Sequence, residues 1–178
     1  MEDQNAQSEK VTTRSVGIRY GLIMSVLSIA FFVIMNVAGL DMQGPVGYLG
    51  WVITAVMLFL AHKYYKEQGD GFMSIGQGVG IGFWAGTVSS IISSIFTYVY
   101  IKFIDDGFLQ MIKDKQIEGM QDRGMSDEQI EQAMEFASAF SSPEAILGFG
   151  IVFGILAAVI IGLLVSLITK NNNPDLEA

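Results

Sequence analysis

Apolar residues gather into four long runs along this chain, separated by two short polar segments and one long acidic segment. The most continuous run is residues 72–101, which contain no charged side chain. A helix of that length, at about 1.5 Å per residue, would exceed the roughly 30 Å hydrocarbon core of a bilayer. The pattern predicts an all-α membrane protein, with four transmembrane helices in an antiparallel bundle at about 18–40, 45–62, 74–102 and 143–169.

The polar segments complete the predicted organisation. Residues 1–15 and 171–178 form polar tails, and residues 16–170 form one transmembrane domain. Within that domain, residues 105–142 are predicted to be an extracytoplasmic helical hairpin. Its first apolar stripe ends near Gly124, which is typical of a residue just after a helix, and Ser126 with Gln129 has the spacing of a capping box. Ser74 is placed as the N-cap of the third span.

Composition excludes several classes of function. The net charge is −8, which argues against a nucleic-acid partner because phosphate binding needs clustered Lys and Arg. The chain has no cysteine, so disulfides and thiolate chemistry are excluded. Charged residues make up 16% of the chain, against about 25% in ordinary soluble domains. We therefore expect membrane lipid as a partner, and neither a cofactor nor a bound metal.

The distribution of Lys and Arg near the ends of the spans predicts an orientation. The first loop has none, and the hairpin side has Lys102, Lys113, Lys115 and Arg123 within an acidic segment. The opposite side has Lys10, Arg14, Arg19, Lys63, Lys66 and Lys170. We expect both termini to be cytoplasmic and the hairpin to lie outside.

Small residues recur at every fourth position in the third span and suggest close helix packing. Glycines or hydroxyl residues at such spacing let two helix backbones approach. The candidate packing residues are Gly78, Gly82, Gly86, Ser90 and Ser93, with Gly150 and Gly154 in the fourth span and Gly17 and Gly21 in the first. Packing within the bundle is the ordinary interpretation, and a dimerisation face or a flexible transport helix is the functional alternative.

Polar residues are few within the spans. Asn36 and Gln77 are candidate intramembrane amides, which would hydrogen-bond between helices or bind a substrate. His62, the only histidine, is placed at the membrane boundary. Proton relays and ion-coupled pumps keep ionisable residues at membrane depth, and their absence here argues against a proton-coupled transporter.

The predicted hairpin is acidic, and two interpretations stay open. It could lie on the membrane as an amphipathic pair, or form a self-packed knob that faces a partner or only solvent. Surface-seeking helices are usually rich in Lys and Arg, whereas this segment carries Asp127, Glu128, Glu131 and Glu135. The charge favours the self-packed or partner-facing interpretation.

Two stretches resemble a known family. Residues 66–77 (KEQGDGFMSIGQ) and 96–105 (FTYVYIKFID) are similar to a bacterial family described as domain of unknown function 4199, within a resemblance that covers about Arg14 to Lys170. The family often has Pro after the Asp, where this chain has Asp106 followed by the helix breaker Gly107. The resemblance implies a four-span protein of Bacteroidota in the inner membrane, with no established activity and no functional residues to transfer.

The leading hypothesis from the sequence is a non-enzymatic accessory or scaffold subunit of the bacterial inner membrane. It would form a homo-oligomer or bind a membrane-protein partner through the small-residue face of the third span or through the hairpin. The alternative is a small oligomeric channel or transporter that uses the glycine-rich third span. A membrane enzyme ranks third because no cluster of catalytic side chains is visible.

Overall fold

The computed structural model describes residues 11–40, 44–105, 107–138 and 140–173, and the expectations for residues 1–10, 41–43 and 174–178 lie outside them. The described residues form helices without a strand; one isolated bridge joins Met73 to Asn171. The helices are α1 (Thr13–Val37), the 3₁₀ helix η1 (Pro45–Tyr48), α2 (Leu49–Gln68), α3 (Ile75–Phe103), α4 (Phe108–Asp122), α5 (Asp127–Ser138) and α6 (Pro143–Thr169).

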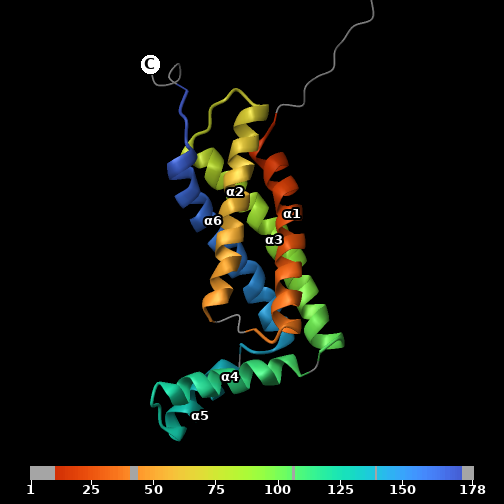
Figure 1. Ribbon diagram of the computed structural model, residues 1–178, viewed down its shortest axis with the longest axis vertical. Coiled ribbons are helices and arrows are strands. Elements are labelled where there is room, and N and C mark those ends of the chain that lie inside the picture. Colours follow the sequence, from red (N-terminus) through yellow and green to blue (C-terminus); the bar gives the residue numbers. More distant parts are fainter. Residues whose placement is uncertain (1–10, 41–43, 106, 139, 174–178) are drawn as a thin grey trace, which may run out of the picture.

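Four of these helices form an up-and-down bundle. α1, α2 with η1, α3 and α6 are long and apolar enough to cross a membrane. α1 and α3 run from the end where the described chain begins toward the hairpin, and α2 and α6 run back (Figure 1). α3 is the central helix because its most extensive contacts are with α6 on one side and α1 on the other. The predicted all-α membrane fold with four spanning helices and a helical hairpin is confirmed.

Local side-chain caps explain where several helices begin. The Ser74 hydroxyl accepts from the Gln77 backbone N–H at 3.2 Å, and the Gln77 amide oxygen accepts from the Ser74 backbone N–H at 2.7 Å. The same reciprocal arrangement joins Ser126 and Gln129 at the start of α5. Each such cap satisfies backbone donors that a helix start leaves free, and is worth about 1 kcal/mol.

The bounds of α1 and α2 differ from the sequence expectation. α1 starts before residue 18, at Thr13, because Thr12 caps it. α2 starts only at Leu49, after the turn of 3₁₀ helix that opens with Pro45, and it continues past His62 to Gln68. The basic and aromatic residues after position 62 are compatible with a helix, so the change in polarity there does not end it.

The bundle is tied together at the end opposite the hairpin. Met73, just before α3, exchanges two backbone hydrogen bonds with Asn171, just after α6, at 2.8 and 2.9 Å. The Lys66 ammonium donates to the Thr169 carbonyl at 2.9 Å. These bonds fix the α2–α3 turn against the end of α6.

The hairpin begins with α4, which crosses the other end of the bundle (Figure 1). Phe108 is buried, and its ring lies 5.6 Å from Phe32 of α1 and 6.0 Å from Tyr100 of α3, between ring centroids. After α4, Gly124 has φ of +75°, a left-handed conformation that glycine adopts without a steric penalty. This aromatic cluster and turn position the hairpin against the bundle.

Candidate functional site

Small residues at every fourth position line the contact between α3 and α6. A Cβ on Gly82 would lie 2.9 Å from the Ala158 carbonyl oxygen and 3.2 Å from the Gly162 Cα. A Cβ on Gly154 would lie 2.6 Å from the Ser90 Cβ. Because the helices are antiparallel, the contacts form a ladder: Gly78 with Ser166, Gly82 with Gly162, Gly86 with Ala158, Ser90 with Gly154, and Ser94 with Gly150.

A neighbouring face of α3 packs as closely on α1. A Cβ on Gly17 would lie 3.0 Å from the Ile81 carbonyl oxygen, and one on Gly21 would lie 2.8 Å from the Ala85 carbonyl oxygen. Such approaches are possible only for helices with small residues at the crossing. The glycines that the sequence singles out thus lie at the contacts of the central helix α3 with α6 and with α1.

Ser93 is the exception among the predicted packing residues. The ladder passes through Ser94, which faces Gly150 and also lines a pocket, whereas Ser93 lines that pocket without belonging to the ladder. Sequence reasoning also missed Ala158, Gly162 and Ser166, the remaining α6 residues of the ladder. The spacing of four from Gly150 and Gly154 could have found them.

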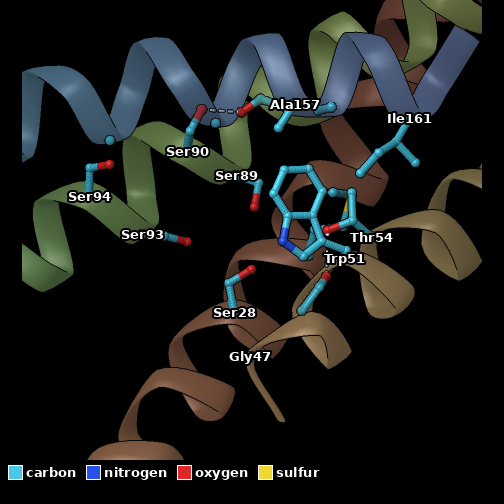
Figure 2. A pocket seen from close by; sticks show the side chains of 16 residues that line it. Ser28, Gly47, Trp51, Thr54, Ser89, Ser90, Ser93, Ser94, Ala157 and Ile161 are labelled. Atoms are coloured by element: carbon cyan, nitrogen blue, oxygen red, sulfur yellow. Dashed lines mark hydrogen bonds between the residues drawn. The ribbon is translucent and has the colours of Figure 1, made fainter. Parts of the chain in front are cut away.

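The pocket lies in the half of the bundle nearest the hairpin and has a volume of about 280 Å³. That is just below the roughly 300–1,000 Å³ of ordinary small-molecule sites. Figure 2 shows the side chains around it, which come from α1, the η1–α2 segment, α3 and α6. Its polar lining consists of Ser28, Thr54, Ser89, Ser90, Ser93 and Ser94, and none of the described lining residues is charged.

The hydroxyl groups of this pocket differ in their bonding. The Thr54 hydroxyl donates to the Gly50 carbonyl at 2.9 Å, and the Ser90 hydroxyl donates to the Gly86 carbonyl. The Ser93 oxygen is buried and has no hydrogen-bond partner among the described residues. The hydroxyls of Ser28, Ser89 and Ser93 point toward the same space, beside the indole of Trp51 (Figure 2). The pocket therefore offers hydrogen bonds without charge.

An apolar cluster closes the pocket on the side away from the hairpin. Its buried members are Met24, Met57, Leu58, Ala85, Ile161 and Val165, from all four spanning helices. Met24 and Ile161 also line the pocket, so the cluster forms its floor. Trp51 lies on the wall of the pocket and is 55% exposed, so the pocket is open beside it.

His62 lies beyond that floor and is fully buried. Its Nε2 lies 3.1 Å from the Gly78 carbonyl oxygen, and its Nδ1 lies 2.8 Å from the Thr169 hydroxyl. A carbonyl can only accept, so Nε2 donates to Gly78. The Thr169 hydroxyl also donates to the Val165 carbonyl at 2.8 Å, so it links the ring to the backbone of α6. The ring fits because Gly78 has no side chain: a Cβ there would lie 3.1 Å from the His62 Cε1.

The two candidate amides have separate roles, and neither lines the pocket. The Asn36 amide donates to the Tyr100 hydroxyl, which joins α1 to α3. Gln77 is exposed and its side chain caps its own helix at Ser74, so the expected bond between helices is wrong for this residue. Among the described residues, no group of three or more His, Asp or Glu side chains could hold a metal ion.

Comparison with known proteins gives a family and no activity. The model of one family, described as "Protein of unknown function (DUF4199)", matches residues 19–171. No curated protein and no solved structure matches the chain. The matched residues include all four spanning helices except the first turns of α1, and also the pocket and the hairpin. The chain therefore belongs to the DUF4199 family of proteins of unknown function.

Proposed function

We propose that this protein is a non-enzymatic membrane protein that binds a small, uncharged polar solute in the hydroxyl-lined pocket and carries it across the bilayer. The observation that supports the proposal most directly is the buried Ser93 oxygen, which has no partner and faces the pocket. An unsatisfied buried polar group costs about 1–3 kcal/mol, which a bound solute would recover.

The lining favours a neutral solute over an ion. Hydroxyl groups can both donate and accept hydrogen bonds, so they suit polyols and amides. An ion would need a countercharge or a dense shell of carbonyl oxygens, because an isolated charge is costly at membrane depth. The described lining offers neither a charge nor such a shell. The apolar floor would then separate the pocket from the other side of the membrane.

The accessory-subunit hypothesis loses one of its two expected contact surfaces. The small-residue face of α3 packs on α6, and the neighbouring face packs on α1, so neither is open to a second protein. A scaffold role would have to use the hairpin or the outer faces of the bundle. The pocket is a more specific feature than either, and this is why we rank the carrier function first.

We infer that the protein lies in a bacterial inner membrane, with both termini cytoplasmic and the hairpin outside. The distribution of Lys and Arg supports this orientation, and the chain has no native cysteine to interfere with labelling. In intact spheroplasts, Ser126→Cys should react with an impermeant thiol reagent and Gln68→Cys should not. The reverse labelling would overturn the orientation.

The carrier function is tested by flux in proteoliposomes. Glycerol and urea serve as uncharged probes, and their entry is followed by the light scattering of osmotically shrunken vesicles. We expect faster recovery than in protein-free vesicles, and loss of that gain in Ser93→Leu, which fills the pocket. Ala30→Leu adds the same side chain on an exposed position of α1 and should keep wild-type flux.

Recovery at the protein-free rate for both probes would refute the carrier function. Equal flux in Ser93→Leu and wild type would show instead that solutes cross by another route. Both variants are first checked for folding by their far-UV circular dichroism and gel-filtration profiles in detergent, so that misfolding is not mistaken for a blocked pocket.

A further inference from the structure

A row of four phenylalanines runs from the hairpin onto the outer surface of α6. Phe136 and Phe140 have ring centroids 5.3 Å apart, Phe140 and Phe149 are 5.5 Å apart, and Phe149 and Phe153 are 6.0 Å apart. All four belong to the exposed large hydrophobic residues, with Phe136 at 73% and Phe153 at 63%. The row is therefore continuous, yet most of its surface has no protein cover among the described residues.

The α6 end of this row lies on the apolar outer surface of a spanning helix. α6 is the most apolar of the four spanning helices, and Val152, Leu156 and Ile160 are exposed along it together with Phe153. An exposed apolar surface on a spanning helix contacts lipid. Since each ring touches the next, the lipid-facing surface extends from α6 to the C-terminal end of α5.

The charged residues of α5 point elsewhere. Successive residues on a helix are about 100° apart, so Glu135 lies about 100° and Glu131 about 140° around the axis from Phe136. Ile130, the buried residue of α5, lies about 120° away on the other flank. Phe136 thus occupies a face of its own, away from the buried position and from these two acids.

We infer that the C-terminal end of α5 is seated in the membrane interface, with Phe136 and Phe140 in contact with lipid and the acidic flank in water. The contact is with the glycerol and upper acyl region, because the acids would repel anionic headgroups. This seating is the membrane-lying alternative, whereas the charge alone favours a self-packed or partner-facing hairpin. It does not depend on the pocket or on the solute.

Brominated lipids test the seating through tryptophan fluorescence. The reporter is Phe136→Trp in a Trp51→Phe, Trp84→Phe background, which keeps an aromatic ring in the row. The matched control is Glu131→Trp in the same background, on the acidic flank of the same helix. Each full-length protein is reconstituted in vesicles of phosphatidylcholine and phosphatidylglycerol, with the phosphatidylcholine brominated near the headgroup end of its acyl chains.

The seated helix predicts at least threefold stronger quenching by brominated lipid for the Phe136→Trp reporter than for the control, and the opposite order with aqueous acrylamide. This order should not change with the protein-to-lipid ratio. Equal quenching of the two reporters by brominated lipid would overturn the inference. Protection of the Phe136→Trp reporter from both quenchers, increasing with protein density, would also overturn it and assign the row to a contact between two copies.

Discussion

A single methyl group on Gly82 should destabilise the bundle measurably. In Gly82→Ala the new Cβ would lie 2.9 Å from the Ala158 carbonyl oxygen, whereas ordinary contact begins at 3.4 Å, so the backbones must separate by 0.5 Å (3.4 − 2.9). Neither obstructing atom belongs to a side chain that could rotate away, because the second is the Gly162 Cα at 3.2 Å. The whole ladder must therefore loosen.

The cost follows from two opposing effects. A gap of 0.5–1 Å removes about a quarter to a half of the dispersion attraction between facing atoms, and overpacking typically costs about 1–3 kcal/mol. Replacing glycine by alanine within a helix returns about 0.5–1 kcal/mol. We expect Gly82→Ala to lower the free energy of unfolding by about 1–2 kcal/mol, which is about fivefold to thirtyfold in the equilibrium constant.

Unfolding in mixed micelles of dodecyl maltoside and dodecyl sulfate, followed by far-UV circular dichroism, measures this difference. Gly148→Ala is the matched control: it lies on α6, and its new Cβ would meet no atom within 4 Å. The control should be as stable as the wild type or slightly more stable. Equal stability of the Gly82 and Gly148 variants would refute the argument that the ladder holds the bundle together.

Three further experiments test other contacts of the fold. His62→Ala should lower the free energy of unfolding by about 3 kcal/mol, because it leaves a cavity and removes two buried hydrogen bonds. The control Lys63→Ala, at an exposed position, should change the free energy of unfolding by less than about 0.5 kcal/mol. Similar values for the two variants would contradict the burial of the His62 ring. In a double-mutant cycle in the same micelles, Asn36→Ala and Tyr100→Phe should couple by about 0.6 kcal/mol, and additive effects would mean that their hydrogen bond contributes nothing. Gly124→Ala should cost about 1–2 kcal/mol in the hairpin, seen as faster amide exchange in α4 and α5, and unchanged exchange would argue against the left-handed turn.

Much of this fold follows from local patterns in the sequence. The uncharged runs predict the spanning helices, since helix length and bilayer thickness are physically linked. Serine and threonine before apolar runs predict helix starts, and Ser74 and Ser126 form the expected caps. Glycine after a stripe predicts a left-handed turn, which Gly124 adopts.

The pocket and the buried histidine could not be predicted in the same way. Ser93 and Ser94 are the same residue type at neighbouring positions, and only the crossing of α3 with α6 decides that Ser94 joins the ladder and Ser93 does not. His62 follows an apolar run and precedes Lys63, so its sequence context is that of a boundary residue. Its burial depends on Gly78 and Thr169, which lie far away in the sequence.

The hairpin shows a third kind of difficulty. Its net acidity argues against contact with a membrane surface. Net charge, however, is an average over the whole helix and does not describe a single face. The ring contact with α6 joins Phe140 to Phe149, and Phe136 packs on Phe140. A sequence pattern gives the face of a helix but not its position along the membrane normal.

The most direct test of the account is whether a neutral solute enters the pocket. In the Trp84→Phe variant, Trp51 is the remaining tryptophan and it lines the pocket, so its emission reports on occupancy. Titration with glycerol and with urea should give a saturable change in Trp51 emission for at least one of them, and adding Ser93→Leu should abolish that change. A response that stays linear and is the same with and without Ser93→Leu would contradict the claim that this pocket binds a small polar solute.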